Sequence, residues 1–173
     1  YIIGAVIAGM IAGFGPNKIV ETIIAGSTTI FPAALAVGVA RGISVLMTNA
    51  KIIDTIVHYL SLPLSQLGPV VSAALMVLVQ TLINFFIPSG SGQAMATLPI
   101  MLPLGHLVGV GEQVTILAFQ IGDGLSNLIY PTVPLVVAYL AFTKIPFSRW
   151  FKHIYPFALQ TMALGIVFTI VGV

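Results

Sequence analysis

Charged residues are scarce in this sequence: Asp, Glu, Lys and Arg make up 6% of its 173 residues, whereas a soluble domain carries about 25%. Cysteine is absent, which excludes a disulfide framework, a zinc–thiolate site and a redox motif. The net charge of +2 comes from scattered side chains, so no basic run could follow the phosphates of a nucleic acid. These absences argue against a water-soluble fold and against a nucleic-acid partner.

Apolar residues dominate instead, with 58% hydrophobic residues and a mean hydropathy of +1.13. A soluble fold of this size could not bury that much apolar surface, whereas a lipid bilayer solvates it directly. The sequence therefore predicts an all-α integral membrane protein that forms a single membrane domain over residues 1–173. The chain begins at Tyr1, inside an apolar run with no charged leader, and we interpret this start as a cut through a longer protein.

Several apolar runs have the length of transmembrane helices or of parts of them, since a span needs about 20 apolar residues. Residues 1–62 are interpreted as scaffold-like helices. They comprise the tail of a span, a short charged piece, a span interrupted by Pro32, and an amphipathic helix at the membrane interface. A last span lies near the C-terminus. The boundaries of these five segments are 1–14, 18–26, 28–48, 50–62 and 154–173.

Residues 68–108 have the pattern of a helical hairpin that enters the membrane and turns back. Two apolar arms flank the polar sequence PSGSGQ at residues 88–93, and the second arm is interrupted by Pro99 and Pro103. The second arm is too short and too broken to span comfortably. Irregular backbone at a tip in the membrane is tolerated only inside protein or beside a water-filled cavity. The sequence therefore predicts a re-entrant hairpin.

Residues 112–143 are too long for one simple span and contain the polar sequence GDGLSN at 122–127. This pattern predicts a discontinuous helix, made of a half-helix, an unwound linker at 122–127 and a second half-helix. Exposed amides and carbonyls at two such breaks can bind anionic and cationic groups. The alternative for each break is an ordinary loop or a packing seam, because glycine and proline are common in membrane helices.

The two breaks supply the candidate site residues. We predict substrate binding by polar and glycine residues near the tip and the broken helix, namely Asn84, Ser89, Gly90, Ser91, Gly92, Gln93, Ser126, Asn127 and Thr132. We predict ion coupling at Gly122, Asp123, Gly124 and Asn127. No catalytic residue, no cofactor and no metal other than a Na⁺ ion near Asp123 is expected.

Two charges inside apolar sequence need an explanation. A carboxylate such as Asp123 facing lipid at the bilayer centre would cost about 2.5–3.5 kcal/mol. It is therefore expected to face a cavity, where it binds H⁺ or Na⁺ or holds a substrate amine; the alternative is a structural helix cap. Arg41 is a candidate charge partner for a substrate carboxylate or for Asp123, and the alternative is snorkelling to the interface.

Loop charge predicts the orientation. The loops at 15–27 and 144–152 contain the basic side chains Lys18, Lys144, Arg149 and Lys152. The positive-inside rule places them in the cytoplasm. The hairpin then opens from the outside, and the C-terminus is outside.

The strings NFFIPSGSGQAMATLPIMLPL, AFQIGDGLSNLIYPT and KIPFSRWFK resemble the C4-dicarboxylate anaerobic carrier (DcuC-like) family, in its YfcC-type branch, and so does ARGISVLMTNAKIIDTIVHYLSLPLS. The resemblance covers nearly the whole chain and implies a multi-pass secondary transporter of the cell inner membrane, within the ion-transporter superfamily. In that group a hairpin tip and a broken helix from each of two inverted repeats build the substrate and ion sites. The tip would be residues 89–92, and the broken helix would include residues 122–127, Pro131 and Thr132.

By this resemblance the chain is the C-terminal repeat, and the N-terminal repeat is missing. The function it implies is ion-coupled symport or exchange of small carboxylates or amino acids, or antiport of basic amino acids such as arginine and ornithine. A homodimer is typical of related architectures.

Two other classes of function remain open at this point. A Ser–Gly run with His106 could belong to an intramembrane serine hydrolase that uses a Ser91–His106 pair. Alternatively, the chain is an inactive truncated membrane fragment.

Overall fold

The computed structural model gives the backbone of residues 1–173, and it describes all side chains except those at 29, 30, 32, 33, 36, 37, 40, 41, 43, 44 and 65. The Arg41 side chain, a predicted charge partner, is therefore outside the described residues. The chain is helical, and the described residues contain no β-strand, so the all-α prediction is confirmed. The helices are α1 Ile2–Ile11, α2 Pro16–Asn49, α3 Ile52–Ser61, α4 Pro69–Phe86, α5 Gly90–Leu107, α6 Glu112–Ser126, α7 Pro134–Thr143 and α8 Phe147–Val171, with a 3-10 turn at Leu62–Gln66.

The long helix α2 corrects the predicted division near residue 27. Residues 18–26 and 28–48 form one continuous helix, and most of the predicted loop at 15–27 is its first three turns. The Ser27 and Thr28 hydroxyls donate to the carbonyls of Ile24 and Ala25, so these polar residues are satisfied within the helix and need not end it. The chain bends after Asn49, where Lys51 adopts a left-handed conformation with φ 56°.

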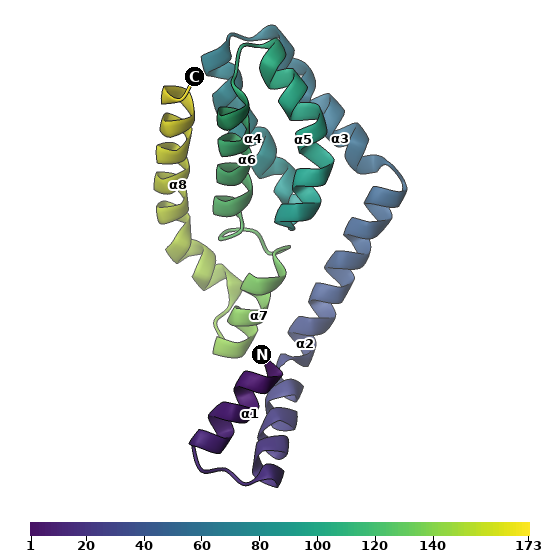
Figure 1. Cartoon of the computed structure of the whole chain (residues 1–173), viewed down its shortest axis with the longest axis vertical. Helices are drawn as coiled ribbons and strands as arrows, with labels where there is room; N and C mark the ends of the chain where they lie inside the picture. Colours follow the sequence, from purple (N-terminus) through teal and green to yellow (C-terminus); the bar gives the residue numbers. More distant parts are fainter.

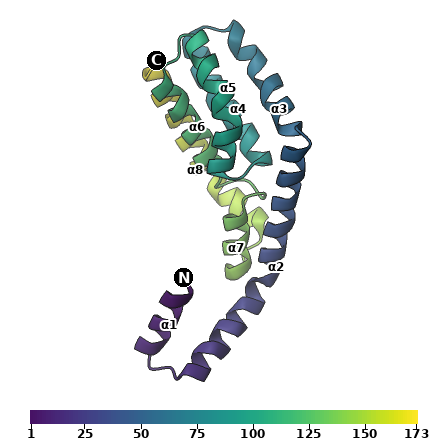
Figure 2. The ribbon, with the colours of Figure 1, turned by 45° about the vertical axis from the view of Figure 1, so that its right-hand side comes forward.

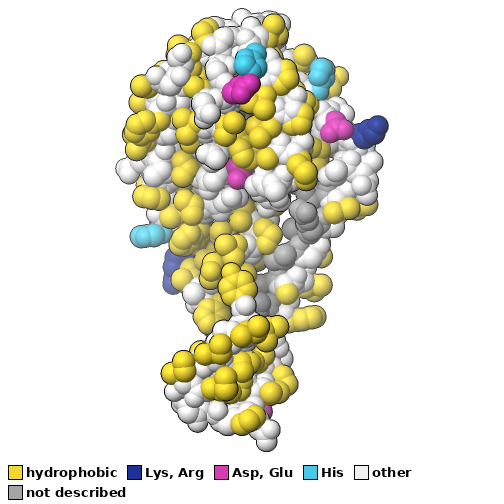
Figure 3. Space-filling model, viewed as in Figure 1, with side chains coloured by type: hydrophobic (Ala, Val, Ile, Leu, Met, Phe, Trp, Pro, Cys, Tyr) yellow, Lys and Arg dark blue, Asp and Glu magenta, His cyan; other side chains and the backbone are white. Residues whose placement is uncertain are grey.

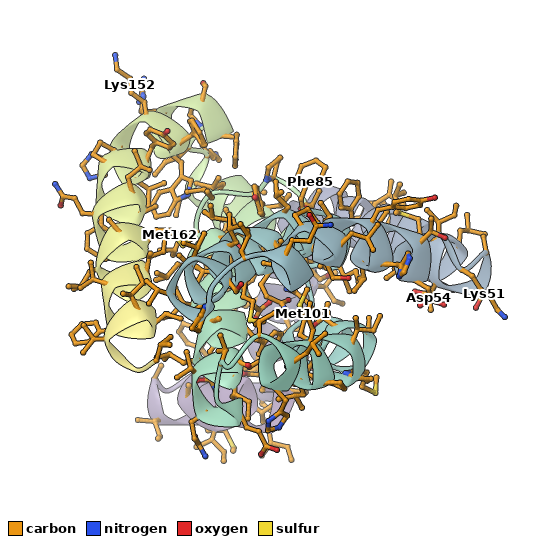
Figure 4. The ribbon with its side chains drawn as sticks, turned by 90° about the horizontal axis from the view of Figure 1, so that it is seen from above. Lys51, Asp54, Phe85, Met101, Lys152 and Met162 are labelled. Carbon is orange, nitrogen blue, oxygen red and sulfur yellow. The ribbon has the colours of Figure 1, made fainter. Side chains whose placement is uncertain are left out.

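Helix α3 continues beyond that bend and has one buried face. Ile53 and Val57 are buried, while Asp54 and His58 are exposed on the other face. Figure 2 shows α3 beside α4 and α5, with α1 and the start of α2 at the opposite end of the molecule. In Figure 4, Lys51 and Lys152 extend away from the helices on different sides, whereas the fully buried Met101 lies among them.

Helices α4 and α5 form a helical hairpin with a three-residue connection, 87–89. Helix α4 ends before Ile87 because Pro88 disfavours the helical conformation of the residue that precedes it; Ile87 has φ −124° and ψ 72°. Ser89 then caps α5, since its Oγ accepts a hydrogen bond from the Gly92 amide. The tip lies near the middle of the molecule, and the open end of the hairpin lies at the same end as the C-terminus (Figure 1).

The second arm of the hairpin is less broken than the sequence predicts. Helix α5 continues through Pro99 and Pro103. These residues are four apart and both are exposed, so their rings lie on one outer face of the helix. The lost backbone hydrogen bonds are therefore tolerated within an 18-residue helix.

Helix α6 packs against α4, α5 and α8. Its contact with α4 is unusually close at Gly122, where an added Cβ would lie 2.6 Å from the Cβ of Gln80 and 2.7 Å from the Val77 carbonyl oxygen. Helix α7 follows after an irregular segment, 127–133, and packs along α2. This segment also lies near the middle of the molecule (Figure 1).

Hydrophobic side chains are widespread on the face that Figure 3 shows, and charged side chains are few there. Large hydrophobic side chains such as Leu82, Phe157 and Phe168 are more than half exposed. Among the described residues, two helices are long and apolar enough to cross a membrane, Pro69–Phe86 and Phe147–Val171.

Candidate functional site

The end of α4 and the end of α6 are joined by one buried side chain, Asn84. Its Nδ2 donates to the Asp123 carbonyl oxygen at 3.0 Å, to the Ser126 Oγ at 2.7 Å and to the Asn127 Oδ1 at 2.9 Å. Asn84 is completely buried, as is Ser126. An amide NH₂ group has two hydrogens, so these three acceptors share them. Through these bonds Asn84 joins the last turn of α6 to α4.

The Asp123 carboxylate faces the tip of the hairpin. A Cβ added to Gly90 would lie 3.3 Å from the Asp123 Oδ2, so the absence of a side chain at Gly90 leaves room for the carboxylate. Gly90 is the first residue of α5, and a helix N-terminus stabilises a nearby negative charge. The other carboxylate oxygen, Oδ1, is buried and has no hydrogen-bond partner.

A second buried polar network joins α4 to α5 behind the tip. Gln93 Nε2 donates to the backbone oxygen and the Oε1 of Gln80, at 2.9 and 2.8 Å. Gln80 Nε2 in turn donates to the Thr97 Oγ1 at 3.1 Å. All three side chains are buried. Gln93 lies one turn after Gly90 on α5, and Gln80 one turn before Asn84 on α4, so the two networks are adjacent.

Among the described residues, four buried side-chain oxygens have no hydrogen-bond partner: Asn84 Oδ1, Gln93 Oε1, Asp123 Oδ1 and Thr132 Oγ1. Each buried polar atom left unpaired costs about 1–3 kcal/mol. Amide, carboxylate and hydroxyl oxygens are ligands for hard cations, and they also accept hydrogen bonds from an ammonium group. The described residues hold no cluster of three or more His, Cys, Asp or Glu side chains that could bind a metal ion.

The predicted unwound linker at 122–127 is wrong. Residues 122–126 are the last turns of α6, and the irregular backbone is at 127–133 instead. Gly122 serves close packing against α4, and Gly124 is exposed with open space around it. The break occurs further along because Pro131 and Pro134 lack the amide hydrogens that a continuing helix needs.

The other predicted residues fall into two groups. Ser89, Gly90, Gly92 and Gln93 lie at the cap and first turn of α5, and Ser126 and Asn127 contact Asn84, so these belong to the region where the breaks meet. Ser91 is exposed on the first turn of α5, and Thr132 lies in the irregular segment. The predicted backbone state of Gly122 and Gly124 is therefore wrong, and the binding and coupling roles of these residues stay predictions.

Trp150, on the first turn of α8, is a functional candidate that the sequence argument missed. Its Nε1 donates to the Leu128 carbonyl oxygen at 2.9 Å, across 22 residues of sequence. Leu128 is in the irregular segment after α6, so this bond fixes a carbonyl that no helix satisfies. In the sequence, Trp150 is an aromatic residue beside the basic residues Arg149 and Lys152, and its hydrogen-bond partner depends on the tertiary fold.

We expect Trp150→Phe to lower the free energy of unfolding by about 0.5–1.5 kcal/mol, because it removes the donor and leaves the Leu128 carbonyl unpaired. Thermal unfolding of the full-length protein in detergent would measure the loss. Tyr155→Phe is the matched control, since it also removes one polar atom from an aromatic residue of α8 and Tyr155 is exposed. Equal stability of the two variants would show that the Trp150 bond does not hold the segment.

Comparison with known proteins gives the family. The family model for the C4-dicarboxylate anaerobic carrier, DcuC, matches residues 1–173. The chain belongs to the DcuC family. It is 41% identical over 145 residues to a protein of Escherichia coli strain K12 named "Putative basic amino acid antiporter YfcC", covering 81% of this chain and 29% of that protein. It is also 29% identical over 168 residues to an uncharacterized protein of Haemophilus influenzae, covering 97% of this chain and 33% of that protein.

These matches confirm the predicted family resemblance. No solved structure matches this chain. The chain spans about a third of the length of the curated relatives it matches. The family is named for a carrier, and the relative from Escherichia coli is named for an antiporter.

The geometry also argues against a serine hydrolase. Ser91 and His106 are on the same helix, α5, and 15 residues of helix separate them by about 22 Å. His106 instead pairs with Glu112 at 3.0 Å on the surface. A Ser91–His106 catalytic pair therefore cannot form in this chain.

Proposed function

We propose that this chain is the C-terminal repeat of a secondary active transporter, an ion-coupled symporter or exchanger of small carboxylates or amino acids. The substrate is held between the tip of the α4–α5 hairpin and the break between α6 and α7. The observation that carries the proposal is the Asp123 carboxylate, which lies against Gly90 where the two breaks meet and has one oxygen without a partner. Such paired helix breaks are typical of transporter binding sites near the bilayer midplane.

The positions of the helix ends support the membrane arrangement that we propose. The open end of the hairpin and the C-terminus lie at one end of the molecule, while both breaks lie near its middle (Figure 1). A bilayer around this body puts the breaks at mid-depth, and α4 and α5 form a re-entrant hairpin. Basic residues near the α1–α2 turn and the start of α8 face the cytoplasm, and the C-terminus is outside. A second repeat and a second copy of the protein complete the transporter.

Asp123 is the proposed site of ion coupling. A bound H⁺ neutralises its carboxylate, and a bound Na⁺ would in addition gain oxygen ligands among the unpaired acceptors of Asn84 and Gln93. Occupation by either cation removes the cost of a buried, unpaired charge. The transporter therefore changes conformation at a lower cost when the site is loaded, which is the physical basis of coupling.

A basic amino-acid antiporter is the second candidate. Asp123 is the negatively charged group at the meeting point of the breaks, and it suits a substrate that carries an amine. The relative from Escherichia coli carries the name of such an antiporter.

The proposal is tested with the full-length protein in liposomes. Uptake of labelled dicarboxylates, arginine, ornithine and neutral amino acids is measured with a Na⁺ gradient, a proton gradient or a preloaded substrate inside. We expect at least one compound to accumulate, and only when one of these driving forces is present. If no compound is taken up or exchanged under any of them, this family member is not a transporter of carboxylates or amino acids.

Ser91→Trp should reduce uptake by at least about tenfold, because a bulky side chain at the exposed first turn of α5 obstructs the tip. Initial uptake rates of the full-length variant, corrected for the amount inserted, would measure this. Met95→Trp is the control, one turn further from the tip and also exposed. Similar rates for both variants and the unaltered protein would show that Ser91 is outside the substrate path.

A further inference from the structure

A cavity of about 700 Å³ lies beside the two breaks. Its walls come from the segment after α6, from α7 and from the start of α8, and they include Val133, Leu135, Val136, Tyr139, Leu140 and Trp150. Pro88 of the hairpin connection and Asn127 at the end of α6 also line it, so one part of the cavity reaches both breaks. Its size is within the range of small-molecule sites.

The lining is apolar and carries no formal charge. No Asp, Glu, Lys, Arg or His is among the described residues that line the cavity. Aliphatic and aromatic walls favour the transfer of hydrocarbon groups from water and disfavour a charged group. The polar side chains of the lining include Asn127, which lies one helical turn after Asp123, and Thr143, the last residue of α7. Through Asn127, one part of the cavity lies beside the turn of α6 that holds Asp123.

We propose that this cavity receives the apolar side chain of a neutral α-amino acid, whose ammonium group lies at Asp123. This inference rests on the proposed transport function and specifies the substrate class. Asp123 Oδ1 is a buried acceptor without a donor, and an ammonium group supplies three donors. A short dicarboxylate would leave the apolar walls unfilled, and the side chain of a basic amino acid would place a second charge among them.

Val136 allows the assignment to be tested because it is on the first turn of α7 and lines the cavity. The full-length protein is titrated calorimetrically in detergent with alanine, 2-aminobutyrate, norvaline and norleucine, and with lysine and succinate. We expect affinity to rise about fourfold for each added methylene. Val136→Trp should remove this rise, so that norleucine binds no better than alanine. Phe142→Trp is the control, an exposed site on the same helix, and should keep the rise.

The outcomes separate this inference from the transport proposal. If affinity does not depend on chain length, or if Val136→Trp leaves the dependence intact, the cavity does not receive the side chain. Preferred binding of lysine or succinate would also overturn the inference, although transport itself would stand. If none of these ligands is bound and no compound is taken up by liposomes, the transport proposal fails as well. If Val136→Trp fails to fold, Val136→Leu replaces it. Leucine is one methylene larger than valine, so affinity should stop rising at a substrate side chain about one methylene shorter than in the unaltered protein.

Discussion

Asp123→Asn is expected to abolish ion-coupled uptake by the full-length protein, with a fall in rate of at least about 10- to 100-fold, the range for loss of a charged hydrogen-bonding partner. Asparagine has nearly the same shape, so the space beside Gly90 remains filled. It cannot bind a proton in the same way, and its amide binds cations and ammonium groups much more weakly than a carboxylate does. The α4–α6 contact should survive, since Asn84 bonds the backbone oxygen of Asp123 and not its carboxylate.

Gradient-driven uptake is measured per amount of inserted protein, and the thermal stability of each variant is measured separately. Glu112→Gln is the matched control, because it removes the other carboxylate of α6, at an exposed position paired only with His106. Exposed pairs of this kind contribute about 0–1 kcal/mol, so the control should behave like the unaltered protein. Unchanged uptake by Asp123→Asn would remove Asp123 from the mechanism, and a loss of stability without a loss of transport per molecule would favour the helix-cap interpretation.

The sequence predicted a break at the hairpin tip because its cause is local, but residues 90–93 of the predicted tip are wrong as irregular backbone, since they form the first turn of α5. Pro88 constrains Ile87 directly, and Ser89 caps the next helix through its own side chain. Neither effect needs the rest of the fold, so the break at 87–89 can be inferred from the residues. The polar residues Asn84 and Gln93 were also identifiable, since a polar side chain in an apolar run must find a partner.

The sequence was misleading where one residue type has two opposite uses. Glycine weakens a helix, but it also lets two helices approach closely. At Gly122 the second use prevails because α4 supplies the neighbouring surface, and no property of residues 122–127 alone reveals this. Similarly, the single helix α2 replaces two predicted segments because the Ser27 and Thr28 hydroxyls bond within the helix.

Features that join distant segments were not predictable. The Trp150–Leu128 bond connects α8 to the segment after α6, and the 700 Å³ cavity has walls from several elements. Their existence depends on how α7 folds back between α2 and α8, which the prolines at 131 and 134 permit without specifying.

The two glycines of the GDG sequence should respond in opposite directions to replacement by alanine. In Gly122→Ala the new methyl group would lie 2.6 Å from the Gln80 Cβ, 2.7 Å from the Val77 carbonyl oxygen and 2.9 Å from the Thr81 amide nitrogen. Two of these are backbone atoms, so α4 and α6 must separate. Overpacking of this kind costs about 1–3 kcal/mol, and the separation also lengthens the bonds that Asn84 makes to α6.

Gly124→Ala is the matched control, two residues away in the same helix. An added Cβ there meets no atom within 4 Å, and alanine favours a helix over glycine by up to about 1 kcal/mol. Thermal unfolding of both full-length variants in detergent should therefore show a lower midpoint for Gly122→Ala and an equal or higher one for Gly124→Ala. If 122–127 were an unwound linker, alanine would have no helix to stabilise at position 124 and no neighbouring helix to strike at position 122. Opposite shifts thus require both the continuous helix and its close packing on α4, the contact that places Asp123 beside the hairpin tip.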